Sequence, residues 1–366
     1  MLLGLQLPFR SPAVGVGHVQ PEGKVMVPIT VNGTTVRLRA TLDANWRWVH
    51  FQDGYKNCFE SSWTCTDAQD CERCVVEGVS TDQYKNTYGI EATDNGVQLQ
   101  FVTGSNVGSR LYLVDDVSGE YFRFVPLNTR VSFDLDLRAV PCAVNAAVYL
   151  VNISTVAPLS ALGVGYGDAQ CPTDIKYATK DGAINLQKNP SCAQEIDLTE
   201  ANNQAMAWTL HPCLNGICDK PGADMNSYRQ GFLDFYGPGK TLDTMRPFTV
   251  VTEFREDSMT RYYLQNGRRL DHPTGPMTYA SVDQWTHSFG EHSEFQSLGG
   301  FSMFLAEKYV FVISLWDDTA TNMQWLDGVM GSGPGSVRGP CANSENPRTT
   351  APGAHYTFSN LVIEAL

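Results

Sequence analysis

The sequence predicts an all-β fold in which two antiparallel sheets pack face to face. Its 366 residues suit one large β-sandwich, and the 42% of hydrophobic residues can fill a substantial core. The 32 glycines and 19 prolines provide for many turns. Segments rich in β-branched and aromatic residues recur along the chain, and several of them alternate polar with apolar positions.

A series of strand-like segments fills most of the chain, with turn signals between them. Asn95 and Gly96 form a turn signal at the start of the first segment, and Asn266 with Gly267 is typical of a hairpin turn. Convincing amphipathic helices are few, and we expect only short ones at residues 306–309 and after Glu200. The predicted strands occupy residues 96–103, 109–116, 120–125, 130–137, 145–153, 248–254, 261–267, 309–318 and 355–366.

The strand signal continues to the last residues, and the chain contains no internal repeat, low-complexity segment or Ser/Thr/Pro linker. We therefore expect one domain over residues 1–366, without an appended module. No apolar run reaches the length of a membrane span. The first residues, MLLGLQLPFRSPAVG, form a short apolar patch without a basic region before it, which is a poor match to a signal peptide.

The formal net charge of -13 argues against a nucleic acid or an anionic membrane as a partner, because both require a basic face. A neutral polymer or a small neutral ligand remains compatible with this charge.

The ten cysteines are even in number, which fits five disulfides and an oxidising compartment. A zinc site is the alternative for Cys58, Cys65, Cys71 and Cys74, but only one C-x-x-C pair is present there. Two glycosylation sequons, which begin at Asn32 and Asn152, also agree with secretion.

The stretch CAQEIDLTEAN places Glu195, Asp197 and Glu200 within six residues. On a strand, Glu195 and Asp197 share one face at about 6.6 Å, whereas Glu200 has the opposite parity and joins them only through a bulge. Two carboxyl groups about 5 to 5.5 Å apart are what a retaining glycosidase needs, one to attack the anomeric carbon and one to protonate the leaving oxygen. Asp197 could orient the attacking group. The alternative is an exposed amphipathic helix over residues 195–208, with acids at its N-terminus.

Trp46, Trp48, Trp316 and Trp325 lie next to polar residues and not in apolar runs. Flat aromatic rings can stack on the apolar faces of sugars, so a role as sugar platforms competes with a half-buried position in the core. His287 and His292 are five residues apart, which fits no standard zinc motif, and we expect both in a surface loop.

Several motifs together resemble glycoside hydrolase family 7, the retaining cellobiohydrolases and endoglucanases. In chain order they are DANWRW, GYGDAQCPTDIKY, CAQEIDLTEAN, TLHPC, FYGPGKTLDT, SLWDDTATNMQWLD and FSNL. The resemblance begins near residue 40 and continues to the end, whereas residues 1–35 match poorly. It implies a curved, concanavalin-like β-jelly roll with a long cellulose-binding groove, and no metal or organic cofactor.

The resemblance also implies roles for individual residues. Glu195 would be the nucleophile, Asp197 its hydrogen-bonding partner, and Glu200 the acid/base with His211 nearby. The four tryptophans would be sugar platforms, and Arg229 with Arg338 would bind the product, as in cellobiohydrolases. The glycone side of the groove would be lined by Asn145, Tyr149, Asp168, Gln170 and Lys176.

The chain departs from the family pattern at several positions. Gly167 and Ala193 replace two cysteines that bond to each other in the family, so no orphan thiol remains. Thr199 stands where the family usually has Trp or Leu. Segments 177–192 and 214–226 are shorter than those of tunnel-forming members. The resemblance implies the pairs Cys58–Cys74, Cys65–Cys71, Cys142–Cys341, Cys171–Cys192 and Cys213–Cys218.

The sequence therefore indicates a secreted, monomeric, retaining β-1,4-glucanase that acts on cellulose or a related glucan chain. The short segments favour an open cleft, and the two arginines favour a cellobiohydrolase-like product site. The alternatives are a strictly processive cellobiohydrolase and a non-catalytic glucan-binding β-sandwich. The paired glutamates favour an enzyme, since a lectin gains nothing from them.

Overall fold

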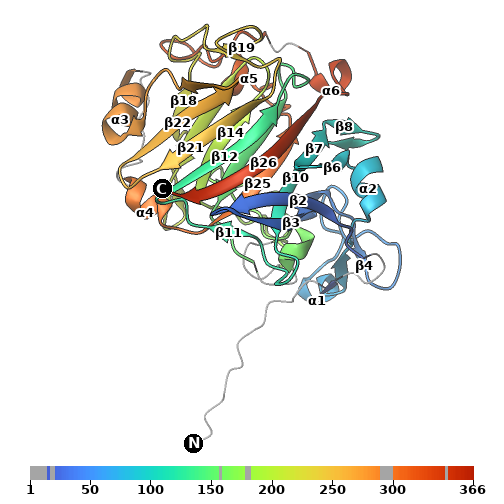
Figure 1. The fold of residues 1–366 in the computed structure, drawn as a ribbon. Helices are drawn as coiled ribbons and strands as arrows, with labels where there is room; N and C mark the ends of the chain where they lie inside the picture. Colours follow the sequence, from blue (N-terminus) through green and yellow to red (C-terminus); the bar gives the residue numbers. More distant parts are fainter. Residues whose placement is uncertain (1–14, 17–20, 156–158, 178–182, 289–299, 343–344) are drawn as a thin grey trace, which may run out of the picture.

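Two layers of mainly antiparallel strands form the molecule in the computed structural model (Figure 1), which describes residues 15–16, 21–155, 159–177, 183–288, 300–342 and 345–366. Hydrogen bonds connect 17 of the described strands into one continuous network. These strands are β2 (Val25–Val31), β3 (Thr34–Leu42), β6 (Ile90–Thr93), β7 (Gly96–Gln100), β10 (Ser109–Val114), β11 (Arg123–Phe124), β12 (Thr129–Asp136), β13 (Asn145–Val151), β14 (Glu195–Ala201), β15 (Met206–His211), β18 (Ala223–Asn226), β21 (Phe248–Phe254), β22 (Ser258–Gln265), β23 (Arg268–Asp271), β24 (Met277–Thr278), β25 (Tyr309–Trp316) and β26 (His355–Ala365).

The network folds back on itself to make the two layers. The inner layer runs in the order β18, β15, β14, β13, β25 and β10, and each neighbouring pair is antiparallel. The outer layer runs β2, β26, β12, β21 and β22, with β2 and β26 parallel. Strand β3 pairs with β10 of one layer and β2 of the other, so it joins them at one edge. The predicted β-sandwich is confirmed.

The main core lies between the layers, and the inner layer is buried on both of its faces. On β13, Val148 and Leu150 point into the main core, whereas Tyr149 and Val151 belong to a second cluster on the opposite face. Alternate residues of a strand point to opposite faces, so the second face is free to carry functional groups beneath the covering loops. This face of the inner layer positions the candidate site.

Short elements complete the described fold. The remaining strands are β1 (Gly15–Val16), β4 (Val49–Phe51), β5 (Cys74–Val76), β8 (Val102–Thr103), β9 (Asn106–Val107), β16 (Cys213–Leu214), β17 (Ile217–Cys218), β19 (Tyr236–Gly237) and β20 (Leu242–Asp243). The α-helices are α1 (Ala68–Cys71), α2 (Thr81–Asn86), α3 (Tyr279–Ser288), α4 (Gly300–Leu305), α5 (Gln324–Asp327) and α6 (Pro347–Thr350).

The two helical expectations are wrong. Residues 306–309 follow α4 and lead directly into β25, where buried neighbours favour the extended conformation of Tyr309. The chain after Glu200 finishes β14 and turns into β15, so the carboxylates belong to a hairpin and not to an exposed helix. Helix α2 was missed, although Ser80 and Gln83 form a reciprocal capping box at its start.

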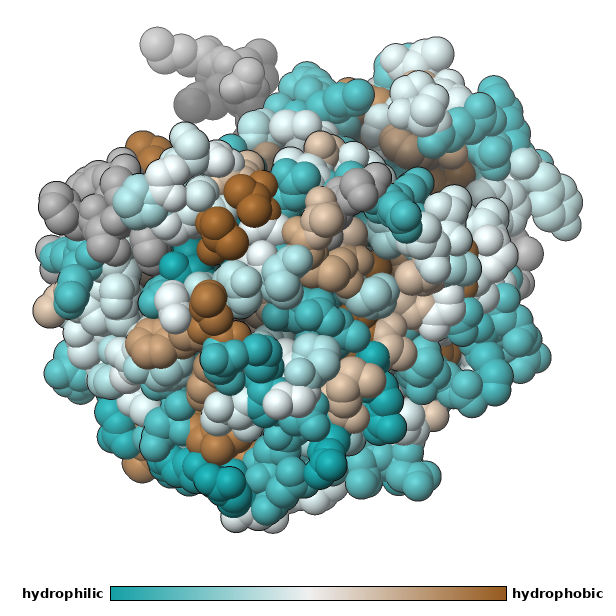
Figure 2. All heavy atoms as spheres, turned by 90° about the horizontal axis from the view of Figure 1, so that it is seen from above, coloured by the Kyte–Doolittle hydropathy of each residue, from teal (hydrophilic) through white to brown (hydrophobic). Residues whose placement is uncertain are grey.

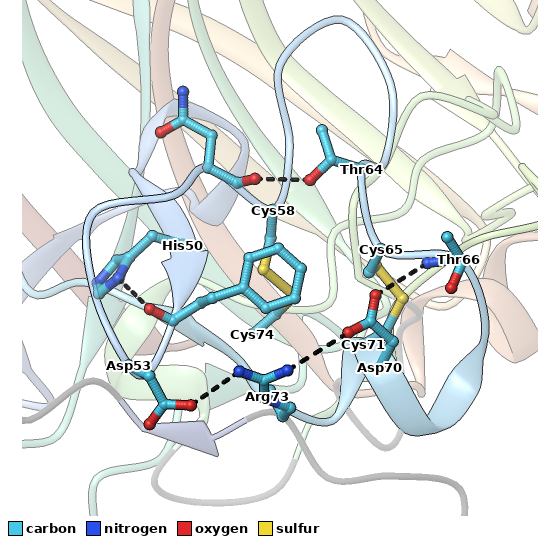
Figure 3. The surroundings of a disulfide bond; sticks show 12 residues. His50, Asp53, Cys58, Thr64, Cys65, Thr66, Asp70, Cys71, Arg73 and Cys74 are labelled. Atoms are coloured by element: carbon cyan, nitrogen blue, oxygen red, sulfur yellow. Dashed lines mark hydrogen bonds and ion pairs between the residues drawn. A yellow bond between two sulfur atoms is a disulfide. The ribbon is translucent and has the colours of Figure 1, made fainter.

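Five disulfides use all ten cysteines, and they are the pairs that the resemblance implies. Two of them hold the small lobe of α1, β4 and β5, where the zinc alternative is therefore wrong. In this lobe Arg73 lies between Asp53 and Asp70 and pairs with both (Figure 3). Cys142–Cys341 instead joins residues 199 apart, and so ties the region before β13 to the end of the chain.

Figure 2 looks down on the upper side of Figure 1 and shows polar residues over most of that face, with small separate apolar patches between them. None of the described helices has both the length and the apolar character that crossing a membrane requires.

Candidate active site

Strand β14 carries the three carboxylates and lies between β13 and β15. Its ladder with β13 shifts between Val148, which pairs with Thr199, and Tyr149, which pairs with Asp197. The ladder with β15 also shifts between Asp197 and Glu200. One extra residue on a strand that otherwise pairs regularly is a β-bulge, a feature common beside active sites.

The bulge changes which face the following residues occupy. Ile196, before the bulge, and Leu198, at the bulge, lie in the main core, so Glu195 and Asp197 point to the other face. After it, Ala201 points into the core, and Glu200 is therefore turned toward the face of the other two acids. All three carboxylates line one cavity of about 830 Å³. The sequence analysis required a bulge for Glu200 to reach the face of Glu195 and Asp197, and the structure contains this bulge.

Each carboxylate has a polar partner on a neighbouring element. The backbone N–H of Ala169 donates to Oε2 of Glu195 at 3.0 Å, and Nδ2 of Asn145 donates to Oε1 of Glu200 at 2.9 Å. Nε2 of His211, on β15, lies 3.1 Å from Oδ2 of Asp197. Partners on three different segments hold the acids in place.

The ring of His211 has its own anchor on the opposite side. Its Nδ1 lies 2.9 Å from the carbonyl oxygen of Asp219, an acceptor that favours a proton on Nδ1. Nε2 then faces Asp197 and can accept a proton from that acid.

Burial raises the pKa of all three carboxyls, because an ionised carboxylate loses its hydration in the protein interior. The charge of Asp197 raises the pKa of Glu195 and Glu200 further. For Asp197, burial outweighs a hydrogen bond with Glu195 and brings its pKa to about 8. The cluster therefore holds protons at a pH where isolated acids are ionised.

The tryptophans divide into two groups. Trp46, Trp316 and Trp325 line the cavity, and the rings of the last two lie 6.0 Å apart at 30°. The indole N–H of Trp46 donates to the carbonyl of Val107, which orients its ring. Trp48 lies outside the cavity lining and is 37% exposed.

The residues expected on the glycone side are also divided. Tyr149, Asp168 and Gln170 line the cavity, and a chain of hydrogen bonds runs from Tyr149 through the hydroxyl of Tyr166 to Asp168. Asn145 contributes through its hydrogen bond to Glu200 and is not itself part of the lining.

Lys176 is likewise outside the lining of the cavity. Its ammonium donates to the carbonyl of Asn45 at 2.7 Å, and burial lowers its pKa to about 8. Of the two histidines expected in a surface loop, His287 belongs to α3 instead, and His292 lies outside the described residues.

Arg229 and Arg338 lie together at another part of the cavity lining. Both guanidinium groups donate to the same carboxylate oxygen of Asp224 on β18, at 3.0 and 2.8 Å. A second donor of Arg229 reaches the carbonyl of Gly335. This arrangement holds two positive groups around one acid at the cavity wall.

Glu195, Asp197 and His211 could each offer one ligand atom to a metal, since these atoms lie within 4.8 Å of one another. The hydrogen bonds described above already account for this grouping. Two carboxyl groups suffice for glycoside hydrolysis, so the chemistry of the donor set does not require an ion.

Residues 28–365 match the sequence model of a known family, described as Glycosyl hydrolase family 7. The chain belongs to this family. It is therefore a glycoside hydrolase of the cellulase type, and the resemblance found in its motifs is confirmed.

Relatives of this family 7 enzyme agree over almost the whole chain. It is 32% identical to "Exoglucanase GH7B" of Limnoria quadripunctata over 443 residues, which covers 99% of this chain and 98% of that one. A cellobiohydrolase structure from Daphnia pulex has a TM-score of 0.89 at 30% identity, covering 96% and 99% of the two chains. A cellobiohydrolase from Melanocarpus albomyces complexed with cellotetraose has a TM-score of 0.86 at 31% identity, covering 96% and 98%.

Other residues at the site of this family 7 enzyme were not found from the sequence. Arg110 lines the cavity, pairs with Asp43 at 2.9 Å, and lies 3.2 Å from the ring centre of Tyr166. A charged residue inside the strand-like stretch SRLYLV was a usable signal for it. Arg348 also lines the cavity and pairs with Asp317, but its position in the short helix α6 gave no signal.

Proposed function

We propose that the chain hydrolyses β-1,4-glucosidic bonds of cellulose or a related glucan by a retaining mechanism with two glutamates. One observation carries this proposal: the β-bulge in β14 turns Glu200 to the cavity face that also carries Glu195 and Asp197. Two carboxyl groups on one cavity wall are the requirement of double displacement. A purely structural cluster of buried like charges would only destabilise the fold.

In the first step Glu195 attacks the anomeric carbon and the bond from that carbon to the leaving oxygen breaks. Glu200 gives its proton to the leaving oxygen, so the departing glucan ends in a hydroxyl group. The hydrogen bond from Ala169 holds Glu195 for this attack. A covalent glucosyl ester on Glu195 results.

In the second step a water molecule replaces the departed chain. Glu200, now ionised, takes a proton from this water while its oxygen attacks the anomeric carbon and the ester bond to Glu195 breaks. Two inversions at the same carbon leave the product in the β configuration. The Asn145 side chain favours the ionised form of Glu200 and steadies it between the steps.

We assign a shared proton to Asp197 and Glu195. Burial raises the pKa of both acids, and the N–H of Ala169 acts against this at Glu195, so one proton and one negative charge are shared between the two carboxyls. Protonated Asp197 can donate to Glu195 and fix its orientation. As negative charge leaves Glu195 on attack, this proton can move toward His211, which lies against Asp197.

We further propose an open cleft that still grips cellobiose as a product. The alignment with the Limnoria exoglucanase extends over 443 positions, whereas this chain has 366 residues, so the relative carries insertions that are missing here. The segment after His211 is a tight hairpin of β16 and β17, closed by Cys213–Cys218. Arg229 and Arg338 at the cavity wall offer charged donors to the product.

The five disulfides and the family support secretion, and the cellotetraose complex of the Melanocarpus enzyme supports a β-1,4-linked glucan as the substrate. A fluorogenic cello-oligosaccharide should be cleaved, and NMR of the first-formed sugar should show the β-anomer. Absence of cleavage would favour the glucan-binding sandwich, and initial release of the α-anomer would refute the retaining mechanism.

The cleavage mode has its own measurement. An open cleft permits internal cuts, so the viscosity of a soluble cellulose derivative should fall early relative to the number of reducing ends formed. Accumulation of cellobiose with almost unchanged viscosity would instead show the strictly processive alternative.

A further inference from the structure

Three parallel rings form a stack outside the catalytic cavity. The ring of His50 lies 4.0 Å from that of Trp48 at an angle of 21°, and the ring of Tyr55 lies 6.0 Å from Trp48 at 11°. Exposure increases along this series, from 2% for His50 through 37% for Trp48 to 86% for Tyr55. The outer end of the stack is therefore a large aromatic side chain that faces solvent.

The loop that carries Tyr55 is firmly anchored. The backbone N–H of Phe51 donates to the carbonyl of Lys56 at 2.9 Å, which closes the loop. Nδ1 of His50 lies 2.8 Å from the carbonyl of Gly54, and its Nε2 lies 2.7 Å from Glu77. A side chain on an anchored loop loses less conformational freedom when a ligand binds.

Trp48 is oriented by the same loop. Its indole N–H donates to Oδ1 of Asn57 at 2.8 Å, and Asn57 is next to Cys58 of the Cys58–Cys74 disulfide. The disulfide lies beside His50 in Figure 3. Both exposed rings of the stack are thus set on a cross-linked frame.

A surface hollow of about 400 Å³ adjoins Tyr55. Its polar groups include Asp53, Asp70 and Arg73, which pair with one another, and the cation of Lys56 lies 4.9 Å from the ring of Phe51. Paired carboxylates and guanidinium groups offer both acceptors and donors to hydroxyl groups. An exposed ring can stack on the apolar face of a sugar while neighbouring polar groups bind its hydroxyl groups.

The stack lies on the segment that enters the catalytic cavity. Trp46 lines that cavity, and Trp48 follows two residues later in the same chain segment. The stacked rings of Trp48 and Tyr55 are thus connected to the cavity wall through a short chain segment.

We propose that Tyr55 and the adjoining hollow form an additional platform, outside the position of Trp48, that binds a β-1,4-glucan chain before it reaches the catalytic carboxylates. The resemblance to family 7 points to Trp48 alone, whereas Tyr55 and the hollow come from the structure. The identity of the ligand rests on the proposed function, but the presence of a platform does not.

The test compares Tyr55→Ala with Tyr55→Phe, which keeps the ring, and with Val117→Ala, a control that is 96% exposed elsewhere on the surface. Binding to insoluble cellulose and to cellohexaose is measured in a Glu195→Gln background, so that hydrolysis does not interfere. Tyr55→Ala should bind about 2- to 10-fold more weakly, the effect expected for one lost ring contact. Tyr55→Phe and the control should bind as the parent does.

Activity on a short fluorogenic cellobioside, measured with Glu195 intact, separates the two proposals. Tyr55→Ala should cleave it at the parent rate, because this substrate is too short to reach the platform. Unchanged cellulose binding in Tyr55→Ala, or an equal loss of cellobioside cleavage, overturns the platform. Failure of the parent itself to cleave any substrate counts against the catalytic proposal, whereas the binding comparison still decides the platform.

Discussion

Strand β14, which we propose as the catalytic strand, and the cavity wall around Asp224, which we propose as the product side, both hold charge, but they hold it in opposite ways. On β14, three acids share one face; burial raises the pKa of all three, and the charge of Asp197 raises the pKa of Glu195 and Glu200 further. At the other wall, Asp224 lies between Arg229 and Arg338, and opposite charges stabilise one another. The acids of β14 can exchange protons, whereas the two arginines around Asp224 remain charged hydrogen-bond donors.

This difference indicates a division of labour. Proton transfer requires a group that can change its charge, whereas gripping a neutral sugar requires donors that do not. The backbone pairing of β14 determines where the three acids lie, and the ion pairs with Asp224 determine where Arg229 and Arg338 lie. Each prediction below removes or tests one side of this comparison.

The largest effect should come from Glu195→Gln, which keeps the shape of the side chain and removes the attacking charge. Turnover should fall by several orders of magnitude while oligosaccharides still bind, because a covalent step is lost. Steady-state kinetics and calorimetry measure the two quantities. Glu307→Gln, at an exposed position, is the matched control and should retain full rate. A Glu195→Gln enzyme with a tenth of the parent rate would rule out this role.

Glu200→Ala should be nearly as severe on natural substrates, because the leaving oxygen is no longer protonated. With a good leaving group the first step can proceed, and azide can enter the space left by the carboxylate to release the ester. Mass spectrometry and NMR should then find a β-glucosyl azide. An α-azide, or no rescue at all, would contradict the assignment of Glu200.

The cross-link between the two regions should make a large contribution to stability. Cys142–Cys341 closes a loop of 199 residues, and Cys65–Cys71 closes one of 6. In the loop-entropy model, removing the first pair costs about 5 kcal/mol and removing the second about 2 kcal/mol. Denaturant unfolding of the two double Cys→Ala variants measures this difference. Equal losses would show that loop length does not govern the effect.

On the product side, Arg338→Ala should weaken inhibition by cellobiose by about 10- to 100-fold, the value of a charge-assisted hydrogen bond. Arg269→Ala is the control outside the cavity lining, where its side chain is 51% exposed and its pair with the exposed Asp271 contributes little. Inhibition constants from initial rates give the comparison. Equal effects of both variants would contradict the proposal that Arg338 binds the cellobiose product.

The smallest effect concerns pH. Burial and the charge of Asp197 raise the pKa of Glu200, so Glu200 stays protonated at a higher pH and extends the basic limb of the kcat/KM profile upward. Asp197→Asn removes that charge, which lowers the pKa of Glu200 and should move the basic limb to lower pH. Asp115→Asn, at the surface, should leave the limb in place. A limb that stays unmoved in Asp197→Asn would show that Asp197 does not act on Glu200 through its charge.

Local signals in the sequence determined most of the strands and the identity of the acidic cluster. Runs of β-branched and aromatic residues predicted β13, β21 and β25, because such residues pack well on the pleated, buried surface of a sheet. The same sequence could not fix the helices, since the end of α4 depends on which neighbours bury Tyr309. Residue types alone also indicated which tryptophans lie near polar groups, but not that Trp48 stays outside the cavity.

The E-x-D-x-x-E motif by itself determined which acids this protein offers for catalysis. Because alternate residues of a strand point to opposite faces, the sequence also indicated that Glu200 needs a bulge to join Glu195 and Asp197. Only the tertiary structure decided that the bulge forms. The bulge is not visible in the motif alone, because it is defined by the pairing of β14 with β13 on one side and β15 on the other, and both of these ladders shift there. Contacts such as Asp224 with Arg229 and Arg338 likewise join residues up to 114 positions apart, a distance over which sequence patterns carry no signal.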